Sequence, residues 1–300
     1  RDAINQGIVM GPRIRASGQG ITPTGGHGDG GGFRDDIFPH PHSGVCDGVA
    51  ECRKAVRTQV KYGADHIKYV ATGGVLSMTA TGIGQQFTNE EQIALVEAAH
   101  AMGRKVAAHA HGKIGMEAAL RAGVDSIEHG SYLDAETADL FVATGAYLVP
   151  TLIAGHTVER IATERPEFYV PEVRQKALEV GPIMKTALRT AYEKGVKIAF
   201  GTDAGVNDHG TNAYEAVLMN EAGMPERAIL ISATINAAEL IGITDITGTI
   251  EVGKDADIIA VSGNPLEDIS TLLQPSYVMV RGNEVDLDVP PVNLFPWPDI

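Results

Sequence analysis

The sequence is poor in the residues that mark disulfide-rich, membrane-spanning and nucleic-acid-binding proteins. Its 300 residues include 2 cysteines, 5% aromatic residues, and 24 Lys and Arg against 38 Asp and Glu. The shortage of cysteine excludes a disulfide scaffold, and nothing in the composition indicates a membrane span. Because the formal net charge is −14, we expect neither nucleic acid nor an anionic membrane to be the main partner.

The two cysteines, Cys46 and Cys52, lie six positions apart in a predicted helix. On a helix, this spacing points the two side chains in different directions. It therefore predicts free thiols rather than a disulfide or a CxxC metal site.

Glycine is abundant, with 35 residues, and 44% of the chain is apolar, a composition that favours an α/β fold with a large core. Short apolar segments predict strands at residues 13–17, 66–71, 105–109, 126–129, 146–151 and 197–202. Helical periodicity predicts helices at residues 47–62, 89–102, 115–122, 134–144 and 172–194. Strands and helices therefore alternate regularly along most of the chain.

This alternation predicts parallel strands joined by crossover helices, and hence an α/β fold of the (βα)8 TIM-type barrel class. Residues 1–247 supply six such units, so we expect a barrel that lacks its first two βα units. The chain starts at Arg1 with neither an initiator methionine nor a signal segment, which agrees with a missing N-terminus and leaves the compartment unpredicted. Residues 248–285 predict a small C-terminal β appendage, part of a β-sandwich, and residues 286–300 predict an extended tail.

Active sites of such barrels lie at the C-terminal ends of the strands, where this sequence places a set of polar residues. Four predicted strands contribute to this set: Lys68 lies within the strand at 66–71, His109 and His111 end the next one, and His129 and Asp203 end two others. Imidazole nitrogens and carboxylate oxygens suit zinc and related divalent ions, and three protein ligands with an open position are typical of a catalytic site. A single histidine at a strand end is more often a packed residue, but this combination predicts a metal centre.

Lys68 needs chemistry of its own, because an ammonium group is only a donor and cannot bind a cation. Reaction with CO₂ would convert it into a carbamate whose two oxygens can bridge two metal ions. A neutral lysine could instead form a Schiff base, as in barrel aldolases, and a third alternative is a buried lysine paired with a carboxylate. The neighbouring histidines favour the carbamate.

Three further histidines extend the predicted site. His111 lies two residues beyond His109 on an extended segment, where it could polarise a scissile carbonyl group. His27 follows two glycines and could bind an oxygen or carboxylate of the substrate. His209 lies in a loop after Asp203 and is a candidate contact at the rim of the site.

Two other segments match the letters of known metal-binding and dinucleotide-binding motifs but not their structural context. His40-Pro41-His42 has the form HxH, but a central proline is unsuited to an interior barrel strand, so we expect a surface or lid loop. Gly26 to Gly31 match GxGxxG without directly joining a strand to a helix, so we do not expect a dinucleotide site there.

The order and spacing of Lys68, His109, His129 and Asp203 resemble the amidohydrolase superfamily. The segments that most resemble its imidazolonepropionase-related metallopeptidase branch are TGGHGD at 24–29, IKYVATGGV at 67–75, AHAHG at 108–112, IEHG at 127–130 and GTDAG at 201–205. That branch includes Xaa-Pro dipeptidases, carboxypeptidases that remove Lys or Arg, and ochratoxin amidases. The resemblance implies two metal ions, with carboxylated Lys68 bridging them, His109 and His129 on one ion, and Asp203 on the other.

The resemblance also implies an HxH motif on the first barrel strand, and no such strand is predicted here. We expect two Zn²⁺ ions per full-length subunit, assembly into a homo-oligomer, and a small peptide or amide as substrate. The expected reaction is hydrolysis of a peptide or amide bond by a metal-bound hydroxide, as in a dipeptidase or carboxypeptidase, with Asp203 as the proton shuttle and His111 beside it. Alternatives are an N-acyl amide or cyclic-amide hydrolase, a Schiff-base lyase, and a non-catalytic barrel.

Overall fold

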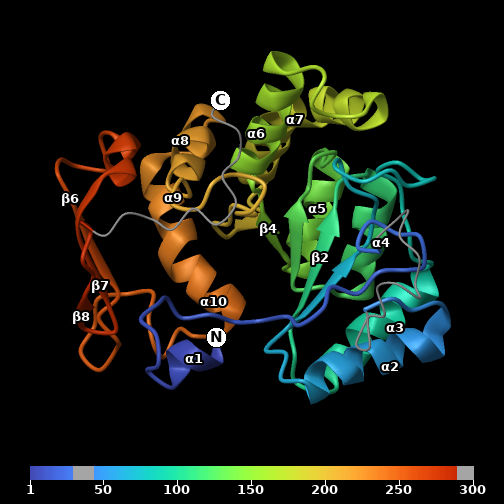
Figure 1. The fold of residues 1–300 in the computed structure, drawn as a ribbon, viewed down its shortest axis with the longest axis horizontal. Helices are drawn as coiled ribbons and strands as arrows, with labels where there is room; N and C mark the ends of the chain where they lie inside the picture. Colours follow the sequence, from blue (N-terminus) through green and yellow to red (C-terminus); the bar gives the residue numbers. More distant parts are fainter. Residues whose placement is uncertain (30–43, 289–300) are drawn as a thin grey trace.

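A parallel sheet of five strands organises the computed structural model, which describes residues 1–29 and 44–288 (Figure 1). The strands are β1 (Ile67–Val70), β2 (Val106–Ala110), β3 (Ser126–His129), β4 (Tyr147–Val149) and β5 (Lys197–Ile198). Their order in the sheet is their order in the sequence, and each pairs in parallel with the next. The predicted α/β class with crossover helices is therefore confirmed, whereas the absence of two barrel units stays a prediction.

Helices connect these strands and lie beside the sheet. The helices before and between the strands are α1 (Asp2–Asn5), α2 (Gly48–Lys61), α3 (Asn89–His100), α4 (Lys113–Ala122), α5 (Ala135–Thr144), α6 (Leu152–Glu164) and α7 (Pro171–Glu193). After β5 follow α8 (Tyr214–Glu221), α9 (Glu226–Ile231), a π-helix (Ser232–Asn236) and α10 (Ala237–Ile241). Helices α2 to α5 pack in sequence order, and α6 packs along α7 (Figure 1).

A second, antiparallel sheet lies at the opposite end of the molecule from α2 and α3 (Figure 1). It consists of β6 (Ile258–Val261), β7 (Pro275–Val280) and β8 (Asn283–Glu284), with a short 3₁₀ helix at Ile269–Leu273. These strands agree with the predicted β appendage, whose domain boundaries stay a prediction. Among the described residues, no helix has the length and apolar character needed to cross a membrane.

Local sequence signals explain where the helices begin and end. Thr88 accepts a hydrogen bond from the Glu91 N–H, and the Glu91 carboxylate accepts one from the Thr88 N–H, so a capping box starts α3. Gly123 and Gly145 end α4 and α5 with φ angles of 93° and 75°. Because glycine adopts this left-handed conformation without a steric penalty, both helices stop where the sequence predicts.

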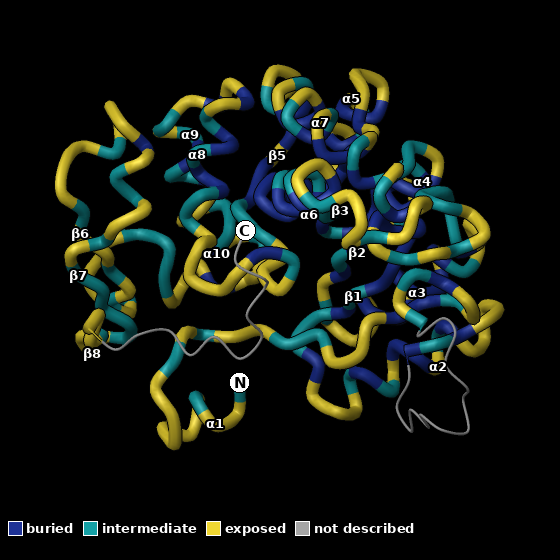
Figure 2. Tube along the Cα trace, turned by 45° about the horizontal axis from the view of Figure 1, so that its top comes forward, coloured by how far each residue is buried: buried dark blue, intermediate teal, exposed yellow. Residues whose placement is uncertain are grey.

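The two faces of the large sheet differ in chemistry. Tyr69 and Ile127 are fully buried, and the Tyr69 hydroxyl donates a 2.9 Å hydrogen bond to Gln92 on α3. Lys68 and Glu128 alternate with these residues along β1 and β3, so they point to the other face. Figure 2 shows the buried chain concentrated around the sheet and its covering helices. The outer face of the sheet is therefore a dry core, and the inner face carries the polar groups.

The predicted strand at residues 13–17 is wrong. Its arginines pair elsewhere, since Arg13 contacts Asp255 and Asp257, and the segment forms no ladder. Instead, Ile21 forms a parallel bridge with Tyr69 at the edge of β1. The hydrogen bonds that hold Ile21 there run from its N–H to Lys68 O (2.8 Å) and from the Val70 N–H to its carbonyl (2.9 Å).

Helix α6 is missing from the predicted helices because Pro150 and Gly155 weaken the helical pattern at its start. Gly155 is required by packing. A Cβ atom added there would lie 2.3 Å from Met184 Sδ, and one added at Gly181 would lie 3.0 Å from the Gly155 carbonyl oxygen. The two glycines therefore allow α6 and α7 to approach closely.

Cys46 and Cys52 are free, as predicted, but they are both buried and their side chains do not point apart. Helix α2 begins only at Gly48, so Cys46 lies in the preceding extended segment, and the two Sγ atoms are 2.7 Å apart. The predicted decoy at His40 and His42 lies outside the described residues, as does the tail from residue 289.

Candidate metal centre and substrate cavity

Most of the predicted site residues line one cavity of 310 Å³ beside the C-terminal ends of the strands. The predicted residues in its wall are His27, Lys68, His109, His111, His129 and Asp203. His209 is exposed and is not among the described residues that line the cavity. The structure thus brings together six side chains that come from positions between 27 and 203 of the sequence.

The backbone at the strand ends is unusual where it presents these groups. His129 ends β3 with a φ angle of 74°, and Asp203, after β5, has a φ angle of 54°. Thr151, which follows β4, has a φ angle of 48°. Residues other than glycine seldom adopt positive φ because Cβ is crowded there, and such conformations concentrate at functional sites.

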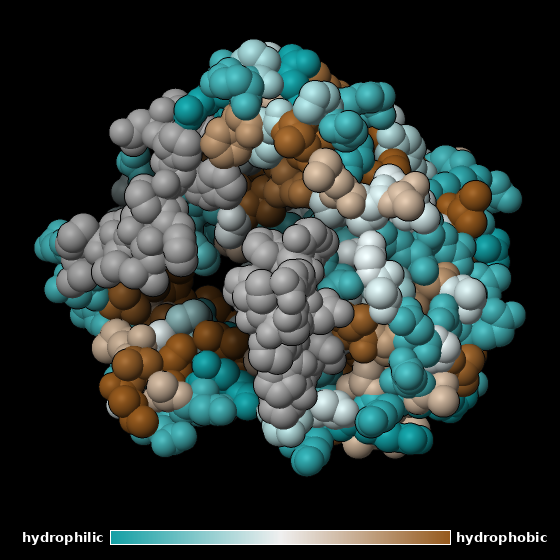
Figure 3. Space-filling model, turned by 45° about the vertical axis from the view of Figure 1, so that its right-hand side comes forward, coloured by the Kyte–Doolittle hydropathy of each residue, from teal (hydrophilic) through white to brown (hydrophobic). Residues whose placement is uncertain are grey.

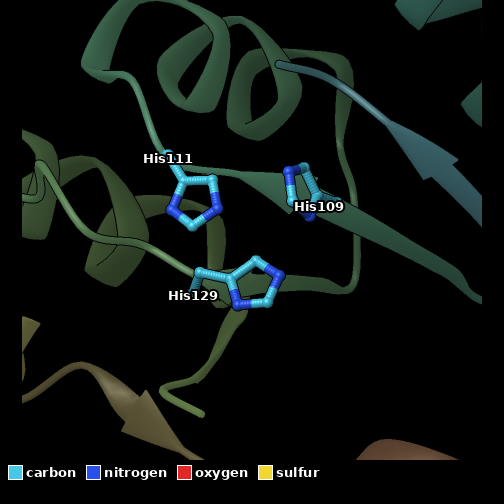
Figure 4. Close-up of side chains that lie close together, drawn as sticks. All are labelled: His109, His111 and His129. Atoms are coloured by element: carbon cyan, nitrogen blue, oxygen red, sulfur yellow. The ribbon is translucent and has the colours of Figure 1, made fainter. Parts of the chain in front are cut away.

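Three histidines form the centre of the site. His109 lies on β2, His111 directly follows that strand, and His129 ends the neighbouring β3. Their candidate ligand nitrogens all lie within 4.8 Å of one another. Figure 4 shows the three rings pointing towards a common region. Ring centroids are 4.6 Å apart for His109 and His129 and 4.7 Å apart for His111 and His129. This cluster could hold a metal ion.

Hydroxyl groups orient two of these rings. His111 Nδ1 forms a 2.7 Å hydrogen bond with Ser131 Oγ, and His129 Nδ1 forms one of 2.7 Å with Thr151 Oγ1. Each bond leaves Nε2 of the ring for the site, which is how outer hydrogen bonds orient ligand histidines. Sequence reasoning missed both hydroxyls, although each follows a strand end closely enough to be a candidate.

The protonation states fit a metal ligand set. Burial lowers the pKa of His109 and His129 well below the usual value for histidine and that of His111 to about 3, so the rings are neutral. His109 Nε2 is buried and has no hydrogen-bond partner. A buried nitrogen with a lone pair is costly unless something binds it, and a divalent cation is a suitable partner.

Lys68 does not join the histidine cluster directly. Its ammonium group contacts the carboxylate of Glu128, a residue that sequence reasoning did not select. Burial lowers the pKa of Lys68 to about 8, and the Asp203 carboxylate acts in the opposite direction. Asp203 lines the same cavity but is not part of the cluster formed by the three histidines.

His27 covers one side of the centre. Its ring stacks on His109, with centroids 4.5 Å apart and an angle of 29° between the planes. Its backbone N–H donates a 2.9 Å hydrogen bond to Gln86. Burial, assisted by Lys176 and Lys68, lowers the pKa of His27 to about 4, so this ring is neutral as well.

The rest of the cavity wall is largely apolar. It is formed by residues of the loop after β1, of α6 and α7, and of the loop after β5: Val75, Leu76, Ala154, Val158, Val180, Met184 and Val206. Figure 3 shows a hollow in the molecular surface with apolar side chains along its walls. Among the described residues, the site therefore combines a polar floor with an apolar wall.

Comparison with known proteins defines the class of this fold and site. Residues 1–285 match the model of the amidohydrolase family, so the chain belongs to that family, whose members have an α/β fold of the TIM-barrel type.

Individual relatives narrow the comparison. A solved Xaa-Pro dipeptidase with bound methionine in its active site is 50% identical, with a TM-score of 0.91 over 95% of this chain and 71% of that one. A prolidase complexed with N-methylphosphonate-L-proline is 34% identical, with a TM-score of 0.86 over 95% of this chain and 72% of that one. Ochratoxinase from Aspergillus niger is 36% identical over 292 residues, which are 92% of this chain and 60% of the relative. The chain thus spans less than two thirds of that curated relative.

Proposed function

We propose that this protein is a metal-dependent hydrolase of peptide bonds that acts on dipeptides or on the C-terminal residue of short peptides. The observation that carries the proposal is the cluster of His109, His111 and His129 beneath a cavity, with His109 Nε2 buried and unpaired. Membership of the amidohydrolase family supports it, as does the similarity to structures described as dipeptidase and prolidase.

The donor set suits zinc. We propose that His109 and His129 hold one Zn²⁺ through Nε2, and that carboxylated Lys68 and Asp203 contribute to a second. Such an ion would polarise a carbonyl group and lower the pKa of a water molecule. Carboxylation requires the neutral amine, so the Lys68 ammonium must first leave the carboxylate of Glu128 and lose one proton. Nζ would then bond to the carbon of CO₂, and the nitrogen would release a second proton.

The chain's own groups then handle protons and orientation. Asp203 accepts a proton from the attacking water at a carboxylate oxygen and passes it to the leaving amine, which would otherwise depart as an unstable anion. His111 donates from Nε2 to the oxygen of the scissile carbonyl group. This requires the Ser131 hydroxyl to donate to His111 Nδ1 across their 2.7 Å contact.

The cavity favours an apolar amino acid at the scissile bond. Within the described residues, its wall of Val158, Val180 and Met184 offers no partner for a charged substrate side chain. Its volume of 310 Å³ is at the small end for ligand sites, which suits a dipeptide. We therefore place dipeptides with an apolar residue ahead of those with Lys or Arg, and N-acyl amides second, because a relative is named ochratoxinase.

A substrate panel tests the proposal. Protein loaded with Zn²⁺ is assayed with Xaa-Pro, Xaa-Met and Xaa-Lys dipeptides, with the same dipeptides amidated at the C-terminus, and with an N-acyl phenylalanine. We expect free apolar dipeptides to be cleaved fastest. Equal rates on the amidated peptides would favour a general amidase, and hydrolysis of none of these substrates would refute the proposal. Borohydride trapping of a substrate adduct on Lys68 would instead support the Schiff-base alternative.

A further inference from the structure

We propose that Lys176, on α7, is a positioning residue that clamps the loop after β1 and thereby orients His27 for substrate binding. The inference rests on the proposed function for its kinetic consequence, but the clamp itself can be tested without turnover. Nothing in the sequence motifs points to Lys176, which lies far along the chain from Lys68, His109 and His129.

The clamp consists of hydrogen bonds from one ammonium group to two backbone carbonyls of the same loop. Lys176 Nζ donates to Gly74 O at 2.7 Å and also to Ser77 O. Lys176 is partly buried, and this burial lowers the pKa of its ammonium group. These two bonds hold both ends of the 74–77 turn. They use two of the three N–H donors of the ammonium group.

The clamped loop in turn fixes the His27 ring at two points. Ser77 Oγ lies 2.7 Å from His27 Nδ1, within hydrogen-bond distance. A Cβ atom added to Gly74 would lie 2.2 Å from Cε1 and 2.4 Å from Nε2 of the ring, so the loop backbone packs directly against it. The third constraint is the stacking of His27 on His109. The loop therefore restricts the ring to a single orientation, and this restriction depends on the loop staying in place.

The position of Lys176 on α7 supports a role in the cavity. Val180 and Met184, which line the cavity, follow Lys176 at intervals of four residues, so all three share one face of the helix. Lys185, one residue beyond Met184, lies on another face and forms an exposed ion pair with Glu221 at 2.6 Å. The same helix thus carries an ordinary surface lysine that can serve as a matched control.

Loss of the Lys176 clamp should weaken substrate binding. His27 lines the cavity as a neutral ring, and the sequence makes it a candidate to bind an oxygen or carboxylate of the substrate. Ser77 Oγ lies within hydrogen-bond distance of Nδ1 and so leaves Nε2 for the substrate. Removing the ammonium releases the loop, so His27 loses its fixed orientation while His109, His111 and His129 keep theirs. Loss of hydrogen bonds from a charged donor predicts a rise in KM of roughly tenfold or more, with a much smaller change in kcat.

The test compares Lys176→Met, Ser77→Ala, their combination and Lys185→Met in the Zn²⁺-loaded protein. We expect the first two to raise KM for an apolar dipeptide and to shift the same His27 ring-nitrogen signal in ¹⁵N-histidine NMR spectra. The combination should be no worse than the more damaging single variant, because both act through one chain of contacts. Lys185→Met should leave KM and the His27 signal unchanged.

Two results would overturn the inference: an unchanged His27 signal in Lys176→Met, or equal effects of Lys185→Met and Lys176→Met on KM. If the wild-type protein cleaves none of the peptides, the proposed function fails. The NMR comparison then still decides whether Lys176 orients His27.

Discussion

His129 and Thr151 are joined by a 2.7 Å hydrogen bond between Nδ1 and Oγ1, and both residues have positive φ angles, 74° and 48°. His129 ends β3 and Thr151 follows the neighbouring β4, so two residues with strained backbones meet at one hydrogen bond. Glu215 on α8 secures the second turn, because its carboxylate accepts hydrogen bonds from the N–H groups of Leu152 (2.8 Å) and Ile153 (2.7 Å) at the start of α6. The orientation of His129, a proposed metal ligand, therefore depends on how α6 and α8 pack against each other.

Replacing Thr151 with Val should weaken metal binding, since the side chain keeps its shape but no longer orients His129. Loss of such an outer hydrogen bond costs roughly 10- to 100-fold in metal affinity. Competition for Zn²⁺ with a chelating dye measures the change. Thr163→Val is the matched control, because Thr163 is exposed on α6 and bonds only to the Glu159 carbonyl oxygen. Equal Zn²⁺ affinities of wild type and Thr151→Val would show that His129 needs no support from Thr151.

Lys68→Ala should lose metal and activity together if the lysine carries a carbamate that holds an ion. Added short carboxylic acids should restore part of both, because they can supply the missing oxygens. Metal analysis and dipeptide hydrolysis are measured on the same preparation. Lys185→Ala, on the surface, should change neither quantity. Full activity of Lys68→Ala would rule out the carbamate.

His111→Ala separates the role of this ring from that of its neighbours in the cluster. If His111 binds the substrate carbonyl group, the variant should keep its zinc and lose roughly 10²- to 10³-fold in kcat, as for the loss of a group that stabilises the transition state. His109→Ala is the comparison and should lose zinc. Loss of zinc from His111→Ala as well would make His111 a ligand rather than a substrate contact.

The buried carboxyl of Glu215 should make stability depend on pH. Burial raises its pKa from 4.5 to about 8 in the folded protein, although the two N–H groups act in the opposite direction. A raised folded pKa favours the protonated form, so its contribution is complete below pH 4.5 and is lost as pH rises towards 8. The free energy of unfolding should therefore fall over this window, by an amount on the order of a few kcal/mol at most.

Urea unfolding of wild type and Glu215→Gln between pH 5 and pH 8 measures this slope. We expect the difference in unfolding free energy between the two proteins to change with pH over that range, because Gln cannot ionise. Glu221→Gln, on an exposed part of the same helix, provides the control. Parallel profiles for wild type and Glu215→Gln would mean that Glu215 is ionised in both the folded and the unfolded state.

The sequence by itself predicted the class of the fold and most of the polar residues that line the cavity. Parallel strands with crossover helices follow from periodicity, and in such folds Lys68, His109, His129 and Asp203 must meet at the strand ends. The periodicity of each segment and the order of the segments along the chain were enough for this inference. It failed at residues 13–17, which form no ladder, and there Arg13 instead pairs with Asp255 and Asp257 from the distant C-terminal region.

Only the tertiary structure decided what holds these residues in place. Three contacts illustrate this: Lys68 with Glu128, His129 with Thr151, and Lys176 with the backbone of Ser77. Each joins segments that are far apart in the sequence. A local pattern shows which face of an element a side chain occupies. It does not show which partner lies within hydrogen-bond distance, because that distance depends on how whole elements pack against one another.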